Sequence, residues 1–304
     1  MKYSLIKVIA ASSFLIILIF LFLYIKNNHI KDPKKNNQDP KKNSQNHKKS
    51  NESSFNDTTN NLINFEKEVK IETTKILDNG IVIKWFSDNG GRKIKFGEVV
   101  LIEYRLALPD GKIIDGNNKL DLPFLPFVLG YNMQTPGWDF AIKELSVGDF
   151  VKIEIPSALA YGEKGIKNII PSNTANWLYV KVHSFVKPSI NKDGITYWKL
   201  EEGDQKINEN AKRELTFHTI ASTSSRPSVI NTYLNDFPTK HITGTDNVVP
   251  GLRQLLKNAN KGDKYYVILE SNQAYGSIGY SNLINANESV FFIINVIDSR
   301  LIKS

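Results

Sequence analysis

The chain repeats itself at a fixed spacing of 114 residues, and this repeat restricts the fold more than any other feature. The motif Ala-Tyr-Gly-x-x-Gly contains Tyr161 in the first copy and Tyr275 in the second. The same offset relates Gly80 to Gly194, Gly130 to Gly244, Gly137 to Gly251, Gly148-Asp149 to Gly262-Asp263, Gly165 to Gly279, and Ile169-Ile170 to Leu283-Ile284. Solenoid repeats have shorter periods, of about 20 to 50 residues. The spacing therefore predicts two tandem domains of roughly one hundred residues each.

Short runs of β-branched and aromatic residues dominate the first copy. They predict strands at residues 80–86, 98–108, 126–130, 150–155 and 176–186. Between them, residues 136–145 place Trp138, Ala141, Ile142 and Leu145 on one face of a short helix. The pattern predicts an α+β fold in which each domain is an antiparallel sheet wrapped on one short helix.

An uncharged, apolar stretch runs from Val8 to Ile25. Eighteen helical residues are about 27 Å long, close to the roughly 30 Å hydrocarbon core of a bilayer. A cleavable signal peptide has a shorter apolar region and ends in small residues, whereas Phe22 to Lys26 are large. We expect residues 1–25 to form an uncleaved, single-span membrane anchor, with a cleaved signal peptide as the alternative.

Lysines lie on both sides of this stretch. The lysines that follow it would retain the domains in the cytoplasm under the positive-inside rule. A basic N-terminus before a single apolar span is nevertheless how most exported chains begin, and long domains translocate despite flanking charge. We therefore expect the domains to be extracytoplasmic.

Residues 26–60 are rich in Asn and Lys and repeat "DPKKNNQ" as "DPKKNSQ". Such a polar tract buries too little apolar surface to fold, which predicts a disordered linker. Residues 1–60 hold ten Lys against four Asp or Glu, so most of the net charge of +8 lies there. This basic tail favours a solvated linker or contact with an anionic membrane, and we expect no nucleic-acid partner. The domains are then residues 61–189 and 190–304.

The residue inventory excludes several kinds of chemistry. The chain has no cysteine, so it forms no disulfide and carries no lipid-modified cysteine. Its five histidines are scattered without metal-ligand spacing, and no glycine-rich phosphate loop follows a strand. We expect neither a metal nor a cofactor.

The segment "PGWDFAIKELSVGD", followed by "IEIPSALAYGEKGIKNIIPSNT", resembles the signature of FKBP-type peptidyl-prolyl cis-trans isomerases. The resemblance covers residues 75–187 in full and 190–300 in degraded form. The anchor and linker are similar to those of membrane-attached bacterial members of the family. The resemblance implies an isomerase that acts on proline-containing, unfolded or partly folded polypeptides and assists protein folding at the membrane.

The resemblance also implies a site in the first domain. Trp138 would form the floor under the proline ring, Tyr161 would donate its hydroxyl to a substrate carbonyl, and Asp115 paired with Tyr104 would orient the twisted amide. The walls and edge of the pocket would be Ile114, Leu125, Phe127, Ile169, Ile170 and Leu178, with Gln134 and the backbone N–H of Thr135. Ile114, Leu125 and Leu178 replace the Phe of many members, and Gln134-Thr135 replaces an aliphatic pair.

The second copy has lost more of the pattern. By the 114-residue offset, Leu252 replaces Trp138, His218 replaces Tyr104, His241 replaces Phe127 and Asn285 replaces Pro171, and the nearest residue to Asp115 is Asn231. Tyr275 remains, and Phe292 stands where the first copy has Leu178. We interpret the second copy as degenerate and His218 as a space-filling residue. A non-catalytic chaperone or binding module, and a structural component of the cell envelope, are the alternative functions.

Overall fold

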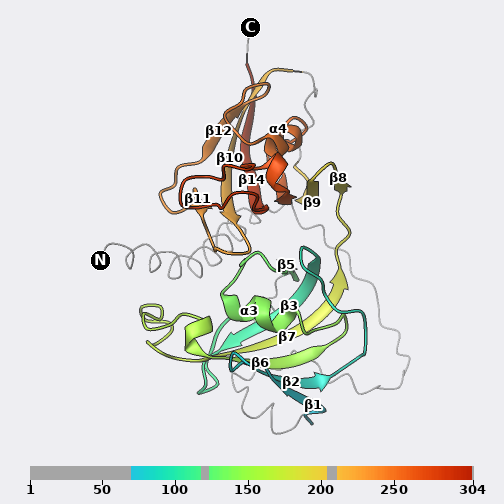
Figure 1. Cartoon of the computed structure of the whole chain (residues 1–304), viewed down its shortest axis with the longest axis vertical. Coiled ribbons are helices and arrows are strands. Elements are labelled where there is room, and N and C mark those ends of the chain that lie inside the picture. Colours follow the sequence, from blue (N-terminus) through green and yellow to red (C-terminus); the bar gives the residue numbers. More distant parts are fainter. Residues whose placement is uncertain (1–69, 118–122, 204–210, 303–304) are drawn as a thin grey trace, which may run out of the picture.

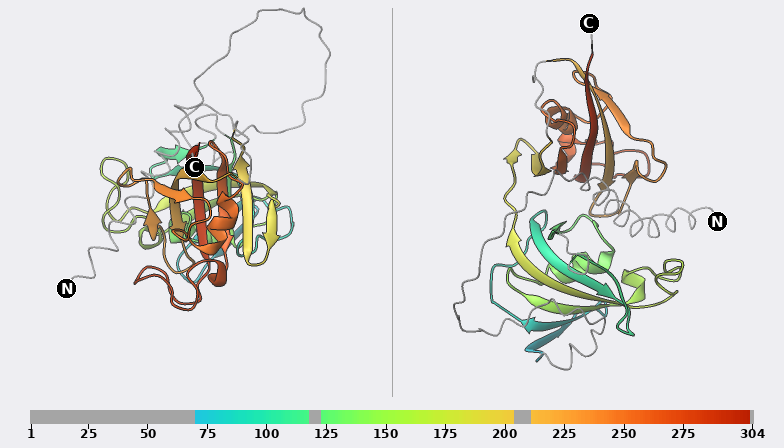
Figure 2. Two further views of the ribbon diagram at one scale, coloured as in Figure 1. Left: turned by 90° about the horizontal axis from the view of Figure 1, so that it is seen from above. Right: turned by 180° about the vertical axis from the view of Figure 1, so that it is seen from behind.

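Two antiparallel sheets, one from each copy of the repeat, follow one another along the long axis of the molecule (Figures 1 and 2). The computed structural model describes residues 70–117, 123–203 and 211–302. We call the part that carries β1 to β7 the first domain and the part that carries β8 to β14 the second domain. The predicted anchor (1–25) and linker (26–60) lie outside the described residues. Within the described ranges, no helix is long and apolar enough to cross a membrane.

The first sheet has the order β1-β2-β6-β7-β3-β4, and β5 pairs with β3. Its elements are β1 (Thr73–Ile76), β2 (Val82–Ser87), β3 (Val99–Ala107), β4 (Ile113–Gly116), β5 (Leu125–Val128), α3 (Pro136–Ile142), β6 (Phe150–Ile155), a 3-10 turn (Ser157–Leu159) and β7 (Asn176–Phe185).

The second sheet has the equivalent order β11-β10-β14-β13-β9-β8, and β12 pairs with β10. Its elements are β8 (Ile190–Lys192), β9 (Ile195–Glu201), β10 (Arg213–Ser222), β11 (Ile230–Asn231), β12 (Thr239–Ile242), α4 (Pro250–Leu256), β13 (Lys264–Leu269), a 3-10 turn (Ser271–Gln273) and β14 (Val290–Leu301). The repeat in the sequence is therefore a repeat of the whole fold.

The five strands predicted for the first copy are confirmed, with shifts of one to two residues at some ends. The short β1 and β4 were not predicted, because β1 is fully exposed and β4 half-buried, so neither has a marked apolar pattern. The predicted helix ends three residues early, at Ile142, although Leu145 is still fully buried in the turn that follows.

Each helix packs directly on the inner face of its sheet through a glycine. A Cβ on Gly137 would lie 2.3 Å from Ile155 Cγ2, and one on Gly251 would lie 2.4 Å from Leu269 Cδ2. A larger residue at position 137 would have to displace Ile155 or the Leu159 carbonyl, 3.0 Å away, and one at position 251 would have to move the end of the Leu269 side chain, since real Cβ contacts are essentially never this short. This close approach explains why both copies keep Pro-Gly at the start of the helix.

The two domains differ by one residue in the register of their central strands. In the first sheet Tyr104 pairs with Val180, whereas in the second sheet the equivalent of Val180, Ile294, pairs with Thr219. Thr219 thus occupies the position of Tyr104, and the prediction that His218 does so is wrong. Adjacent residues of a strand point to opposite faces, so His218 lies on the other side of β10.

The second domain has one more residue before β10 than the first has before β3, and one residue fewer between β10 and β12 than the first has between β3 and β5. Val100 pairs with Phe127 in the first sheet, and Leu215 pairs with His241 in the second, so His241 does occupy the position of Phe127. A constant offset from the sequence cannot detect two changes that cancel.

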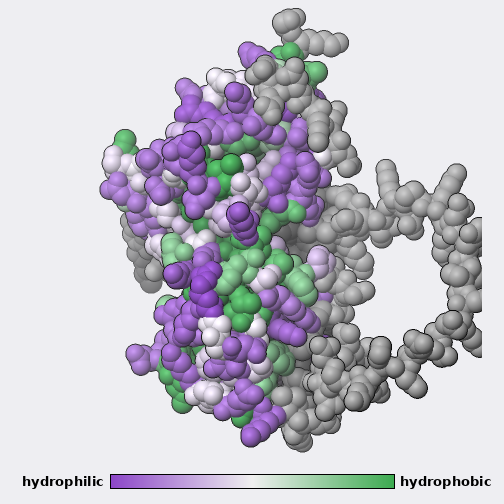
Figure 3. Space-filling view, turned by 90° about the vertical axis from the view of Figure 1, so that its right-hand side faces the viewer, coloured by the Kyte–Doolittle hydropathy of each residue, from purple (hydrophilic) through white to green (hydrophobic). Residues whose placement is uncertain are grey.

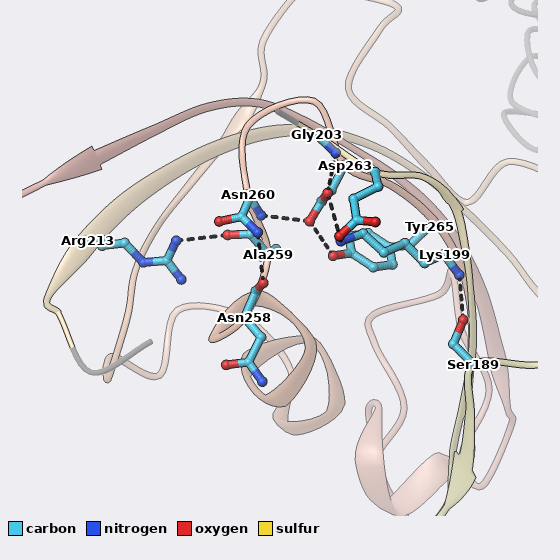
Figure 4. Close-up of polar contacts among 10 residues, drawn as sticks. Ser189, Lys199, Gly203, Arg213, Asn258, Ala259, Asn260, Asp263 and Tyr265 are labelled. Carbon is cyan, nitrogen blue, oxygen red and sulfur yellow. Dashed lines mark hydrogen bonds and ion pairs between the residues drawn. The ribbon is translucent and has the colours of Figure 1, made fainter. Parts of the chain in front are cut away.

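A buried aspartate closes the turn from helix to sheet in each domain. Asp149 accepts hydrogen bonds from the Trp85 indole (3.0 Å) and the Ser146 N–H (3.0 Å). Asp263 has the same place in the second domain, where it accepts from the N–H groups of Gly203 (2.7 Å) and Asn260 (2.7 Å) (Figure 4).

Two side chains complete the surroundings of Asp263. The Tyr265 hydroxyl donates to its carboxylate (2.5 Å), and Lys199 Nζ lies 3.0 Å from the carboxylate (Figure 4). Burial alone would raise the pKa of Asp263, but these donors hold the pKa below its ordinary value. The repeated Gly-Asp of the sequence is therefore a structural turn in both domains.

Asp263→Asn should lower the free energy of unfolding at pH 7 by about 2 kcal/mol, because it removes charge-assisted hydrogen bonds to a fully buried carboxylate. The folded pKa lies below the unfolded value of about 3.9, so this stabilisation is complete at neutral pH and is lost as the pH falls through the folded pKa. Urea unfolding at pH 7 and pH 3 should show the difference from wild type shrinking in acid. Asp246→Asn, at a carboxylate that is 86% exposed, is the control. A pH-independent difference would contradict the assignment.

Candidate active site

The residues predicted to form the site meet in one apolar cluster on the inner face of the first sheet. Tyr104, Phe127, Trp138, Tyr161, Ile170 and Leu178 are buried members of this cluster, and Ile114, Leu125 and Ile169 pack against it half-buried. They come from β3, β4, β5, α3, β7 and the loop between β6 and β7. Residues far apart in the sequence therefore belong to one apolar core, in which Tyr104 and Phe127 contact the Trp138 ring directly.

Trp138 is the centre of the cluster and is 3% exposed. The Tyr104 ring meets the indole edge-on at 5.3 Å between centroids. The Phe127 ring lies more nearly parallel to the indole at 5.9 Å. Aromatic pairs at such distances hold one another in a defined orientation, so the indole is fixed by its neighbours.

The only polar pair predicted for the site is also present. The Tyr104 hydroxyl donates a hydrogen bond to Asp115 Oδ2 at 2.9 Å, and Asp115 Oδ1 accepts the Gly116 N–H at 2.8 Å. Burial and then the neighbouring carboxylate raise the pKa of Tyr104 well above its ordinary value. Tyr104 is therefore a neutral donor at physiological pH, and its hydrogen bond to Oδ2 orients the Asp115 carboxylate.

Tyr161 follows the 3-10 turn after β6 and is 6% exposed. Burial, with a smaller effect of the Asp115 charge, raises the pKa of Tyr161 above its ordinary value. None of the described residues bonds its hydroxyl. Its O–H is thus protonated and available to an acceptor from outside the protein.

Thr135 begins helix α3 as its N-cap. Its carbonyl accepts the Trp138 N–H at 3.0 Å, and Pro136 occupies the first helical position. Among the backbone hydrogen bonds of the described residues, none uses the Thr135 N–H. Gln134 and Thr135 are themselves buried, at 4% and 8% exposed, so their side chains are part of the interior rather than an exposed edge of the site.

Two polar residues that sequence reasoning missed position this site. Asn117 accepts the Tyr104 N–H (2.8 Å) and donates to the Ile102 carbonyl (2.9 Å), which ties the turn after β4 to β3. Asp139 accepts the N–H groups of Gly130 and Asn132, both at 2.8 Å. For Asp139 the only signal in the sequence was its place in the first turn of a predicted helix, where an acidic residue usually interacts with the helix dipole in solvent.

The same place in the second domain has a different chemistry. Thr219, Leu252 and His241 hold the positions of Tyr104, Trp138 and Phe127. Ile230 pairs with Ala221 as Asp115 pairs with Leu106, so an isoleucine takes the place of the carboxylate. Tyr275 remains, but the floor and the polar pair do not.

His218 and His241 are bonded to neighbours within the second domain. His218 Nδ1 lies 3.0 Å from the Thr232 hydroxyl, and His241 Nδ1 lies 2.6 Å from Asn247 Oδ1. In the described ranges, no three His, Cys, Asp or Glu side chains come together to hold a metal ion. The histidines therefore have structural partners.

Residues 90–183 and 204–297 both match the family of FKBP-type peptidyl-prolyl cis-trans isomerases. These two segments make up more than half of the chain, which therefore belongs to that family. Its enzyme class is that of the peptidyl-prolyl cis-trans isomerases.

Fungal proteins are among its relatives. FK506-binding protein 3 of Eremothecium gossypii is 36% identical over 111 residues, which are 36% of this chain and 26% of that protein. FK506-binding protein 2 of Yarrowia lipolytica is 33% identical over 110 residues, 36% of this chain and 74% of that protein. The match to the solved three FKBP domains of wheat FKBP73 covers 75% of this chain and 99% of that one, at 19% identity and a TM-score of 0.36. The resemblance to membrane-attached bacterial members stays a prediction.

Asp115→Asn should lower the pKa of Tyr161, because a nearby negative charge disfavours the tyrosinate. Burial should still keep this pKa above the ordinary value of about 10. Titration by NMR of tyrosines labelled at the ring carbon Cζ measures it directly. Tyr275, whose pKa is raised to about 12 by burial and then Tyr280, is the internal control and should not move. An unchanged Tyr161 would place the carboxylate too far away to act.

Proposed function

We propose that the first domain catalyses cis-trans isomerisation of Xaa-Pro bonds in unfolded or partly folded polypeptides. The observation that carries this proposal is the gathering of Trp138, Tyr161 and the Tyr104–Asp115 pair in one apolar cluster of a family member. The chain matches only about a quarter of the length of the Eremothecium gossypii protein, and its activity is therefore a proposal.

Isomerisation is a rotation about the peptide C–N bond, and no covalent bond forms or breaks. The barrier to rotation about the peptide bond is roughly 18–20 kcal/mol, and it makes uncatalysed exchange at proline take tens to hundreds of seconds. At the twisted transition state the amide loses resonance and its carbonyl loses part of its dipole. An apolar, water-poor site favours this state over the planar amide, which is catalysis by differential binding.

Each group of the cluster has a part in this scheme. The indole of Trp138 supports the proline ring, and the free hydroxyl of Tyr161 donates to a substrate carbonyl. The Thr135 N–H holds a second carbonyl. Asp115, held by Tyr104, presents its charge towards the twisted amide. Leu125, Phe127, Ile170 and Leu178, together with the half-buried Ile114 and Ile169, keep water away.

The second domain does not catalyse this reaction in our proposal. It has Leu252 where the indole would be, and Thr219 and Ile230 where the polar pair would be. An aliphatic side chain offers no flat face to the proline ring. These replacements support a degenerate second copy with another role.

Prolyl exchange on a short Xaa-Pro peptide, measured by NMR exchange spectroscopy on the full chain, tests the proposal. Trp138→Ala should lower kcat/KM by about 10- to 100-fold through loss of the floor. Tyr161→Phe should lower it by about 5-fold, the effect of one hydrogen bond of about 1 kcal/mol.

Leu252→Ala and Tyr275→Phe are matched controls, since they alter the same positions of the second domain. They should leave exchange catalysis unchanged. Equal losses from both sets would show that the second domain contributes to catalysis as much as the first. A folded wild-type protein that binds unfolded chains without accelerating exchange would refute the isomerase and favour a non-catalytic chaperone or binding module.

We further propose that residues 8–25 anchor the chain in a membrane, with the domains on the extracytoplasmic side, where they assist folding. The support is the length and apolarity of this stretch in the sequence. The full chain should resist carbonate extraction from membranes. Leu15→Lys with Ile19→Lys should release it, because each charge at the centre of a span costs about 3 kcal/mol. Asn36→Lys in the linker is the control, and extraction of the wild type would refute the anchor.

A further inference from the structure

We propose that the second domain positions the active site of the first, and that Tyr266 and Asn132 are the positioning residues. This inference rests on the proposed function for its catalytic consequence. Its structural part is independent of activity. The contacts that carry it join the second domain to β5 and to the loop that leads from β5 to α3.

The first contact is on strand β5. The Tyr266 hydroxyl donates a hydrogen bond to the Pro126 carbonyl at 3.1 Å. Pro126 lies between Leu125 and Phe127, which are both part of the site cluster. Tyr266 is 4% exposed, and its ring meets Phe291 edge-on at 5.1 Å. A buried, oriented hydroxyl of the second domain therefore holds the backbone between two residues of the proposed site.

The second contact is on the loop that follows β5. Asn132 donates through Nδ2 to the carbonyls of Thr223 and Ser224, both at 2.9 Å. The neighbouring Tyr131 hydroxyl lies 3.0 Å from Ser289 Oγ. Asn132 has a φ of 50°, a left-handed conformation that asparagine tolerates better than most residues. The second domain thus binds this loop at Tyr131 and Asn132.

Asp139 connects this loop to the helix that carries Trp138. Its carboxylate accepts the backbone N–H of Gly130 and of Asn132, and it follows Trp138 directly in α3. A loop held by the second domain is therefore tied by two hydrogen bonds to the helix that carries the indole. The loop is thus held by Tyr266 at Pro126, where it leaves β5, and by Asp139 in α3.

The outer face of the second sheet is built for this contact. Trp198, Tyr266 and Ile268 stand where the first sheet has Lys84, Lys152 and Glu154. In the first sheet these positions form ion pairs, with Glu154 at 2.6 Å from Lys84 and 3.3 Å from Lys152.

In the second sheet the same positions are apolar or aromatic, and Trp198, Tyr266 and Phe291 join the core cluster of the first domain. Apolar side chains gather where the two domains meet (Figure 3). Trp198 also donates its indole N–H to Val186 in the connection at 2.8 Å. A buried, aromatic contact of this kind resists relative motion of the domains, unlike the polar contacts of freely moving ones.

Tyr266→Phe in the full chain tests the proposal, because it removes one hydroxyl and keeps the ring. We expect amide hydrogen exchange of Gly130 and Asn132 to accelerate by about 5-fold, the effect of one lost hydrogen bond. The indole N–H resonance of Trp138 should shift, and kcat/KM for prolyl exchange should fall by about 5-fold. Tyr280→Phe, at a tyrosine of the second domain that is 47% exposed, is the matched control and should change none of these.

Asn132→Asp is the second variant. It keeps the size of the side chain and the tolerance of a left-handed backbone, but it replaces the donor by an acceptor that faces two carbonyls. It should reproduce the effects of Tyr266→Phe. If both variants lose stability to urea while the exchange at Gly130 and Asn132, the indole resonance and kcat/KM stay unchanged, the interface is merely structural and the inference is overturned. If the wild type is inactive, the proposed function fails, and the exchange and resonance readouts still decide the positioning.

Discussion

The rest of the structure depends on how closely α3 approaches the inner face of the first sheet. Gly137 permits a separation at which any side chain would collide with Ile155, and Trp138, the next residue, is thereby set into the hollow of the sheet. Tyr104 and Phe127 can then pack on the indole from β3 and β5. A wider separation would leave a cavity or let water in, and the apolar surroundings that the proposed isomerisation requires would be lost.

The two domains have the same fold but different side chains on the two faces of their sheets. Gly251 repeats the close helix–sheet contact in the second domain, and Leu252 is a buried member of its core. Its inner face has Thr219 and Ile230 at the positions of Tyr104 and Asp115, while its outer face has Trp198 and Tyr266 where the first sheet has lysines. In our proposal the second domain does not catalyse, and its aromatic residues lie on the face that contacts its neighbour.

The fold and the proximity of several candidate residues were predictable, because a short, ordered set of motifs in one domain indicates the family. Trp138, Tyr161 and the Tyr104–Asp115 pair lie together as that resemblance implied. Asn117 and Asp139 were not predictable, since their roles consist of hydrogen bonds to backbone groups that are distant in sequence or lie across a turn. The assignment of His218 to the place of Tyr104 was wrong because two changes of one residue cancelled in the offset.

The sequence by itself determined that the chain contains one fold twice, which family that fold belongs to, and which copy retains the aromatic and acidic residues of the site. Local patterns carry this information, because strand alternation and motif spacing are properties of neighbouring residues. Only the tertiary structure decided which face of each strand meets the pocket and which meets the other domain. That outcome depends on strand register and on contacts such as Tyr266 to Pro126, which join residues 140 positions apart.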